Sequence, residues 1–215
     1  MLRKSHAVLA ANLALGIWTC VSALPGTQAL TGNPSGARTS PQGQERPVLA
    51  SATIKDAKGR AIGWFQIDRD TAASSWVTVR VRGLTPGFHG FHIHSAGVCD
   101  AASTDPATGS PFSSAGGHLD AGHGADASGN LPSLLAARDG VASAGFRTDR
   151  FTAARLADAD GSAVIVHAGP DNFANIPSRY RHPKDATGTS GPDVATLKTG
   201  DAGRRVGCGI IHLAG

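Results

Sequence analysis

The sequence predicts an all-β domain, an antiparallel β-sandwich or barrel whose functional site is built from two long loops. The 215 residues include 28 glycines and 12 prolines, which favour frequent turns over long helices. Short segments alternate between apolar and polar residues, whereas no stretch has a convincing helical pattern. Two long, polar, glycine-rich segments lie at 95–130 and 168–204. Loops of this length inside a compact domain are usually functional or disordered.

The clearest strand is expected at 77–81, where valines alternate with polar residues. A second strand is expected at 63–67, and the polar segment 68–75 between the two predicts a hairpin. Residues 83–87 are typical of a turn. Further strands are expected at 88–94, 144–148, 163–167 and 205–213.

The first residues predict an export signal. Arg3 and Lys4 give a positive start, and an apolar run over 7–23 follows. Small residues offer cleavage sites after Ala23 or after Ala29. A membrane anchor is the alternative, but it needs about 20 mostly apolar residues, and this run is shorter and interrupted. We therefore expect a cleaved signal peptide and an exported protein.

The chain is expected to have three parts: a leader at 1–29, a disordered linker at 30–47 and a folded domain at 48–215. The linker is rich in Gly, Pro, Ser and polar groups, which is typical of a flexible tether. Such a spacer suits a periplasmic, envelope-bound or secreted protein, tethered to the membrane or envelope through its N-terminus. Loss of the leader removes two basic residues and lowers the formal charge from +4 to +2, too mild a charge to indicate nucleic-acid binding.

Three cysteines bear on the redox compartment. Cys20 lies in the expected leader, where lipid attachment is an alternative, although the residues before it match such sites poorly. Cys99 and Cys208 remain as an even pair, which in an exported protein favours a disulfide. Two free buried thiols are the other interpretation. A disulfide here would close a loop of about 110 residues, for which chain-entropy reasoning gives an upper value of about 4.7 kcal/mol.

A histidine-rich strand carries the candidate chemistry. Residues two apart in a strand face the same side, so His92 and His94 can offer two imidazoles to one metal ion. Such a pair is also what two exposed strand histidines would look like. His89 has the opposite parity, alongside Phe91 and Ile93, which predicts a hydrogen-bonded structural histidine facing the core.

Two more histidines stand in distinctive contexts. His118 follows Gly116 and Gly117, and glycines let the backbone approach a site closely. His167 ends an apolar strand just before a long loop, a place well suited to metal ligation. Four imidazoles without an available thiolate suit copper, although zinc also accepts imidazole.

These residues resemble the copper–zinc superoxide dismutase family. The resemblance runs from about residue 48 to residue 213, nearly the whole expected mature domain. Its motifs, in the family's order, are Gly87-Phe88-His89-Gly90-Phe91-His92-Ile93-His94, Cys99, Ser114-Ala115-Gly116-Gly117-His118, His167 and Gly200-Asp201-Ala202-Gly203-Arg204-Arg205-Val206-Gly207-Cys208-Gly209. The segment Asp171-Asn172-Phe173-Ala174-Asn175-Ile176-Pro177 resembles exported forms from high-GC Gram-positive bacteria.

The resemblance implies a Greek-key β-sandwich or flattened barrel, an architecture for which this family is a standard example. It implies one copper ion per chain, held by His92, His94, His118 and His167. It also places the two cysteines of the domain on the family's disulfide. Members of the family occur as monomers and as homodimers, and both states stay open here.

The zinc site of the family is degraded in this sequence. In two-metal members the residue matching His118 bridges copper and zinc, and two further histidines and an aspartate complete the zinc site. The stretch matching the last part has Ala127 in place of the histidine and Asn130 in place of the aspartate. His123 is a weak candidate for the remaining position. Structural zinc normally takes four protein ligands, so we expect a copper-only member of the family.

The resemblance implies superoxide as the substrate, with dioxygen and hydrogen peroxide as products. Arg205, three residues before Cys208, matches the arginine that guides anions to the copper. Lys198 matches an attracting lysine in the second long loop, although a solvated loop charge is an equally good interpretation. His118 matches the residue that carries a proton during turnover, although here it has no second metal to bridge.

Two other functions fit part of the pattern. A non-catalytic copper buffer or chaperone of the same fold would need the histidines but not Arg205. A structural or adhesive β-sandwich of the cell envelope would need neither, and the shared face of His92 and His94 argues against it.

Overall fold

Buried and exposed residues alternate along the strands, as the sequence pattern predicts. In β3 (Ser75–Val81) the valines are buried, and the residues between them are more exposed. In β1 (Val48–Lys55) every second residue from Ala50 onward is buried. Each of these strands therefore lays one face on the core and turns the other outward.

The computed structural model describes residues 46–120, 126–180 and 190–215, so the expected leader and nearly all of the linker lie outside it. The other strands in these ranges are β2 Ala61–Arg69, β4 Gly87–His89, β5 Phe91–His94, β6 Leu134–Ala136, β7 Ala142–Thr148, β8 Ala163–His167, β9 Arg205–Ile210 and β10 His212–Leu213. The helical segments are η1 Ser113–Ala115, α1 Ala153–Leu156 and α2 Val194–Thr199. None of the described helices is long and apolar enough to cross a membrane.

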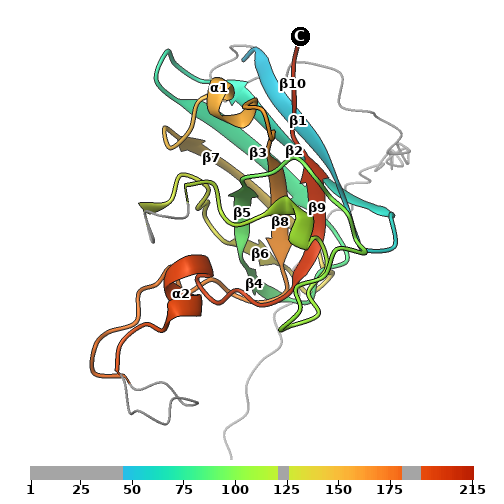
Figure 1. Ribbon diagram of the computed structural model, residues 1–215. Helices are drawn as coiled ribbons and strands as arrows, with labels where there is room; N and C mark the ends of the chain where they lie inside the picture. The colour runs from blue at the N-terminus through green and yellow to red at the C-terminus, as the bar shows by residue number, and fades with distance from the viewer. Residues whose placement is uncertain (1–45, 121–125, 181–189) are drawn as a thin grey trace, which may run out of the picture. The chain divides into compact units, whose positions relative to one another are not determined.

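The strands form one antiparallel sheet that curls almost into a barrel (Figure 1). Its order is β4-β6-β7-β3-β2-β1-β9-β8-β5, and β10 pairs with β1. Strand β9, near the end of the chain, returns to lie beside β1. A long return beside an earlier strand is the mark of Greek-key topology. The predicted all-β Greek-key sandwich or flattened barrel is confirmed.

The two edge strands of this sheet, β4 and β5, are joined by Gly90 alone. The Gly90 N–H donates to Gly169 O at 2.8 Å, and the Gly90 carbonyl accepts from His167 N at 2.9 Å. A Cβ at Gly90 would lie 2.5 Å from Cβ of Ala202 and 3.2 Å from Cε1 of His92. Glycine is therefore required where the chain passes from one sheet edge to the other, directly beside two candidate metal ligands.

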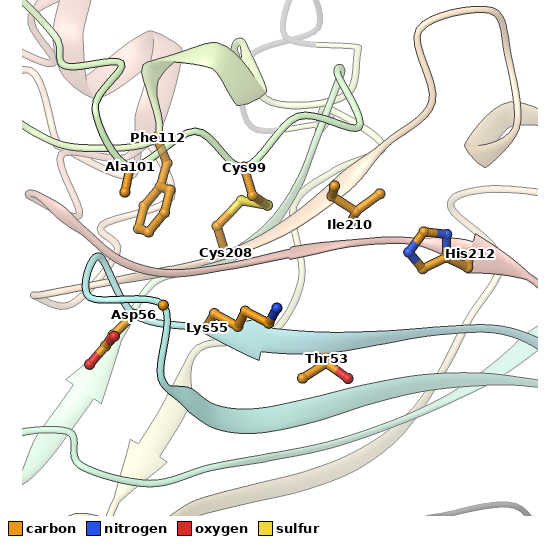
Figure 2. A pocket seen from close by; sticks show the side chains of 10 residues that line it. Thr53, Lys55, Asp56, Cys99, Ala101, Phe112, Cys208, Ile210 and His212 are labelled. Atoms are coloured by element: carbon orange, nitrogen blue, oxygen red, sulfur yellow. A yellow bond between two sulfur atoms is a disulfide. The ribbon is translucent and has the colours of Figure 1, made fainter.

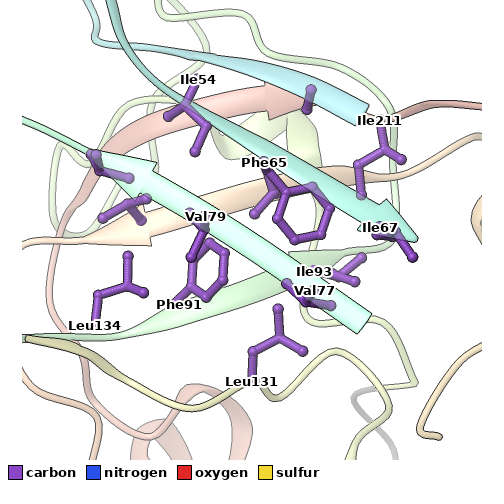
Figure 3. Close-up of a cluster of buried hydrophobic side chains, with 14 of the residues drawn as sticks. Ile54, Phe65, Ile67, Val77, Val79, Phe91, Ile93, Leu131, Leu134 and Ile211 are labelled. Atoms are coloured by element: carbon purple, nitrogen blue, oxygen red, sulfur yellow. The ribbon is translucent and has the colours of Figure 1, made fainter. Parts of the chain in front are cut away.

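Two phenylalanines anchor the core inside the sheet (Figure 3). Phe65 of β2 and Phe91 of β5 meet edge to face, with ring centroids 5.9 Å apart. Ile93 and other fully buried aliphatic side chains pack around them. Burying one such side chain contributes about 1.5–3 kcal/mol relative to leaving it exposed. Because side chains alternate along β5, this packing turns His92 and His94 to the opposite face.

Parts of the sheet differ from the sequence-based expectation. The strand expected at 88–94 is two strands, β4 and β5, because the chain changes partners at Gly90. The strand expected at 205–213 is also two, because Ile211 leaves the ladder and donates to Ser162 O. Strands β1 and β6 were not expected, since β1 buries small alanines and β6 has only 3 residues. Helix α2 in the second long loop, with 6 residues, is too short to show a periodic pattern.

A disulfide joins the first long loop to β9. Cys99 and Cys208 are bonded, with Cα atoms 5.7 Å apart and a sequence separation of 109, so the predicted bond is confirmed. The bond lines a surface pocket together with Phe112, Ile210 and His212 (Figure 2). It ties the loop that contains His118 in its later part to the strand that begins with Arg205.

Removal of this bond should lower the free energy of unfolding by about 2–5 kcal/mol, the usual effect of losing a native disulfide. We expect the double variant Cys99→Ser, Cys208→Ser to have a lower urea midpoint than the unchanged protein, as followed by circular dichroism. A thiol reductant should lower the midpoint of the unchanged protein to a similar extent and leave the double variant unaffected. Equal midpoints for the oxidised protein and the double variant would show that the bond does not stabilise the fold.

Candidate metal centre

Four buried histidines from three parts of the chain meet at one point. His92 and His94 project from β5, and His167 ends the neighbouring strand β8. His118 lies in the first long loop and forms an isolated β-bridge with His94. One ring nitrogen of each histidine lies within 4.8 Å of those of the other three. In the part of the chain that the structure describes, this is the one such group of three or more His, Cys, Asp or Glu side chains.

The nitrogens that face the shared centre have no hydrogen-bond partner among the described residues. They are Nδ1 of His92 and Nε2 of His94, His118 and His167. A buried polar atom left unsatisfied costs about 1–3 kcal/mol. Four such atoms in one place are explained by a ligand that accepts four lone pairs, and a metal ion is such a ligand. The residues therefore fit a metal with imidazole ligands.

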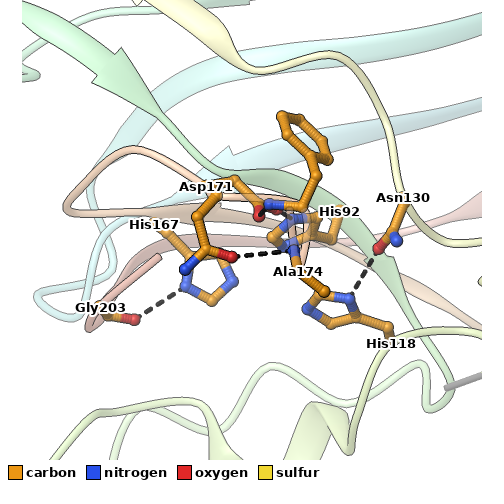
Figure 4. A network of polar contacts seen from close by, with 9 residues as sticks. His92, His118, Asn130, His167, Asp171, Ala174 and Gly203 are labelled. Carbon is orange, nitrogen blue, oxygen red and sulfur yellow. Dashed lines mark hydrogen bonds and ion pairs between the residues drawn. The ribbon is translucent and has the colours of Figure 1, made fainter. Parts of the chain in front are cut away.

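Backbone carbonyls hold the outer nitrogens of two of these rings. His94 Nδ1 donates to Gly116 O at 2.9 Å, and His167 Nδ1 donates to Gly203 O at 2.9 Å (Figure 4 shows the latter). A carbonyl oxygen can only accept, so each ring carries its proton on Nδ1 and keeps the lone pair on Nε2. Both rings are thereby fixed in the tautomer that binds a metal through Nε2.

Side chains hold the outer nitrogens of the other two rings (Figure 4). His118 Nδ1 donates to Oδ1 of Asn130 at 2.8 Å. His92 Nε2 donates to the carboxylate of Asp171 in a short bond. A carboxylate acceptor raises the basicity of the ring that bonds to it. All four rings thus keep the proton on the outer nitrogen and the lone pair on the inner one.

The second long loop places the Asp171 carboxylate. Its two arms pair through backbone bonds such as Asn172 N–H to Gly200 O at 2.9 Å. Gly200 caps α2 with φ 63°, and a Cβ there would lie 1.7 Å from Asp171 Oδ1. Asp171 was not among the predicted site residues, although its position four residues after His167, at the start of a loop, is a usable signal.

Burial keeps three of the four rings neutral. Burial is the main cause that lowers the pKa of His118 to about 4 and the pKa of His167 to about 3, and electrostatic interaction with the neighbouring His92 ring is the next cause for both. Burial, followed by the charge of Arg205, holds the pKa of His94 well below its usual value. Neutral imidazole is the form that binds a metal, so these three rings are ready to do so at neutral pH.

A guanidinium lies beside the cluster. Arg205, at the start of β9, donates from one Nη to Phe112 O and from the other to Gly116 O, the latter at 2.6 Å. Gly116 O also accepts from His94, so Arg205 and a candidate ligand share one acceptor. Gly116 has φ 73°, and a Cβ there would lie 2.7 Å from Oγ of Ser95, so the backbone conformation favours glycine. Carbonyls carry no net charge, so these two bonds hold the positive charge in place without cancelling it.

The other predicted residues lie outside this cluster or outside the described residues. His89 is buried, and its two ring nitrogens face the carbonyls of His167 and Thr85, each at 2.8 Å. This arrangement agrees with a structural histidine that ties β4 to the end of β8. Lys198 lies in α2, but its side chain is outside the described part of the chain, as is the whole of His123.

Comparison with known proteins identifies the family. A family profile described as "Copper/zinc superoxide dismutase (SODC)" matches residues 62–211. The matched range contains the four clustered histidines, Arg205 and both disulfide cysteines. The chain belongs to the copper/zinc superoxide dismutase family.

Particular relatives extend this match over most of the chain. The proteins named superoxide dismutase [Cu-Zn] of Mycobacterium bovis and Mycobacterium tuberculosis are each 43% identical over 201 residues, which cover 88% of this chain and 82% of theirs. Superoxide dismutase [Cu-Zn] 3 of Arabidopsis thaliana is 33% identical over 80% of this chain and 93% of its own. Among solved structures, the Cu/Zn superoxide dismutase of Brucella abortus matches with a TM-score of 0.54 and 26% identity, over 76% of this chain and 99% of that one.

The lowered histidine pKa values predict that the metal-free protein is destabilised by acid. In the folded state His118 and His167 resist protonation until about pH 4 and about pH 3, whereas unfolded histidines take up protons at about pH 6.5. The contribution of these two rings to the free energy of unfolding should therefore be complete above pH 6.5. It should fall as the pH is lowered toward these values. Each titrating group contributes about 1.4 kcal/mol per pH unit. Urea unfolding of the metal-free protein at pH 7, 6 and 5 measures the slope.

Carboxylates also make the free energy of unfolding depend on pH at low pH, so a variant is needed to isolate the contribution of the histidines. His118→Gln removes one titrating ring and keeps a polar side chain, and it should flatten the dependence between pH 6.5 and 5. An unchanged slope in His118→Gln, or no slope in the unchanged protein, would contradict the conclusion that the rings are buried and neutral.

Proposed function

We propose that this chain is a copper-dependent superoxide dismutase. The observation that carries the proposal is the convergence of four buried imidazoles, whose inward nitrogens lack partners among the described residues, beside a guanidinium. The reaction would turn two superoxide ions and two protons into dioxygen and hydrogen peroxide. Membership of the family and 43% identity to proteins named superoxide dismutase [Cu-Zn] support this activity.

One copper ion per chain would be held by His92, His94, His118 and His167. Imidazole is a good copper ligand, and the two cysteines of the domain are tied in a disulfide, so neither offers a competing thiolate. Bound copper supplies one-electron redox chemistry, by which one superoxide loses an electron and another gains it. The residues around the ion are left with two tasks, which are to attract the anion and to supply protons.

Arg205 is proposed to attract and orient superoxide. Its guanidinium is held next to His94 by two carbonyls, which gives the site a fixed positive charge. Lys198, in the same loop as Asp171, is proposed as a second attracting charge on sequence grounds. His118 is proposed to take up a proton on Nε2, since its Nδ1 already carries the hydrogen that bonds to Asn130.

We propose that no zinc ion accompanies the copper. The His118 nitrogen that would face a second metal donates instead to Asn130 Oδ1. Ala127 and Asn130 stand where two-metal members of the family have zinc ligands, and neither a methyl group nor an amide is a usual zinc ligand. Only His118 and the weak candidate His123 would remain, which is too few for a structural zinc site.

We also propose that the protein is exported and acts in the periplasm, at the cell envelope or outside the cell. The leader expected at 1–29 and the linker at 30–47 support export, and a disulfide between Cys99 and Cys208 suits an oxidising compartment. The domain would act there as a monomer or a homodimer.

Metal analysis tests the proposed copper-only site. The purified protein, supplied with both metals and freed of excess by gel filtration, should contain one copper ion per chain and no stoichiometric zinc. The copper-loaded protein should then disproportionate superoxide. Equal copper and zinc contents would contradict the copper-only site. Copper binding without dismutation would instead identify a copper-buffering module of the same fold.

The role of Arg205 predicts a change in rate and in salt response. Arg205→Ala should keep copper bound and lower kcat/KM by about tenfold or more, because it removes a steering charge. The remaining rate should depend less on ionic strength, since salt screens the attraction that was lost.

Arg204→Ala is the matched control for this test. It removes the same charge from an exposed neighbour whose guanidinium bonds to Gly109 O, away from the carbonyl that Arg205 shares with His94. Its rate should stay close to that of the unchanged protein. Equal losses in the two variants, or an unchanged rate and salt response in Arg205→Ala, would remove Arg205 from the mechanism.

A further inference from the structure

Residues on both sides of the loop that follows His118, at 119–120 and 126–130, are held against β5 by backbone hydrogen bonds. Leu119 N–H donates to Ile93 O at 2.9 Å, and Ile93 N–H donates to Gly129 O at 2.8 Å. Gly129 N–H donates back to Leu119 O at 3.0 Å, which closes a ring of three bonds. A Cβ on Gly129 would lie 2.2 Å from Ile93 O, so glycine is required for this close approach. Asn130 follows directly and is therefore held against β5.

Asp120 fastens the start of the same segment to its end and to α1. One carboxylate oxygen accepts from Ser128 Oγ at 2.6 Å, and the other accepts from the Arg155 guanidinium in a short charge-assisted bond. Asp120 has φ 58°, a left-handed conformation in which Asp is enriched among residues other than glycine. A second arginine, Arg150, donates to Asp126 O at 3.1 Å. Both ends of the segment are thus tied to the stretch around α1.

His118 depends on such support more than the other three histidines do. His92 and His94 lie within β5, and His167 ends β8, so sheet pairing sets their directions. His118 lies in a loop whose backbone is paired with β5 only by an isolated β-bridge to His94 and flanking bonds. Its ring is held by the Asn130 bond on one side and contacts the His92 ring, whose centroid is 3.9 Å away.

We propose that Asp120, Ser128 and Arg155 form a clasp that positions Asn130, and that Asn130 in turn positions His118 for metal binding. Asn130 occupies the side of the His118 ring that faces zinc in two-metal members of the family. Asn130 offers a neutral acceptor, which fixes the proton on His118 Nδ1 and directs Nε2 to the shared centre. The inference rests on the proposed metal site and not on turnover.

A purely structural ion pair would behave differently from a clasp. The Arg155 side chain is 56% exposed and that of Asp120 is 23% exposed. Exposed pairs of this kind have little effect on global unfolding, so loss of Arg155 should scarcely move the urea midpoint. A positioning role should instead appear locally, in the His118 ring and in the copper spectrum.

The first test uses the metal-free protein and NMR of the His118 ring. In the unchanged protein the proton should sit on Nδ1 and exchange slowly with water. Asn130→Leu should abolish this protection, and Asn130→Asp, which keeps an acceptor, should preserve it. Arg155→Ala should speed exchange of this proton and of the Gly129 amide by about fivefold, and Arg155→Lys should restore part of the protection.

The second test uses copper and electron paramagnetic resonance. Asn130→Leu should weaken copper binding by about 10–100-fold, the usual effect of removing a partner of a metal ligand. Arg155→Ala should change the copper hyperfine spectrum. Arg60→Ala is the matched control, because it breaks an exposed Arg–Asp pair with Asp56 on the β1–β2 turn and should change neither the spectrum nor the exchange of the His118 proton.

The outcomes separate the clasp from the proposed function. Unchanged His118 exchange in Asn130→Leu would overturn the role of Asn130. Arg155→Ala behaving like Arg60→Ala in both tests would overturn the role of the clasp. If the unchanged protein failed to bind copper, the proposed function would fall, and the metal-free measurement would still decide whether the clasp positions His118.

Discussion

Where the four imidazole rings keep their protons decides what this site can do. Each ring donates from its outer nitrogen to an oxygen that can only accept, two backbone carbonyls, one amide and one carboxylate. The inner nitrogens are left with lone pairs that point at one another in a buried space. Without a metal this arrangement is costly, and with one it is satisfied. The two long loops supply all four acceptors, and Arg205 bonds to one of them, the Gly116 carbonyl.

The fold supplies that rigidity in layers. Alternation along β5 puts Phe91 and Ile93 into the core and turns His92 and His94 the other way, so the packing of the barrel also aims two ligands. Gly90 lets the chain pass from β4 to β5 close to the His92 ring. The Gly116 carbonyl joins His94 to Arg205, so any shift of the ligand is felt by the charge that would attract the substrate. The candidate metal ligand His94 and the guanidinium that would guide the anion therefore belong to one hydrogen-bonded unit.

The sequence predicted those features that depend on local pattern or on residue chemistry. Two-residue alternation revealed β3, and the spacing of His92 and His94 indicated a shared face. The even pair Cys99 and Cys208 indicated the disulfide. Asp171 left only its position after His167 as a signal, and the pairings of Asp171 with His92 and of Arg155 with Asp120 could not be predicted, because each joins residues far apart in the sequence and leaves no periodic pattern. Asn130 had been interpreted only as a lost zinc ligand, whereas the structure shows it as the acceptor for His118.

If the proposed site is correct, one redox-active ion takes its ligands from these four rings through their inner nitrogens. The decisive measurement is X-ray absorption at the copper edge, combined with pulsed electron paramagnetic resonance of the oxidised protein. We expect a copper ion surrounded by four imidazole nitrogens, with one ring bound through Nδ1 and three through Nε2, and with no sulfur ligand. Two or fewer imidazoles, or a sulfur atom bound to the copper, would contradict the proposed site.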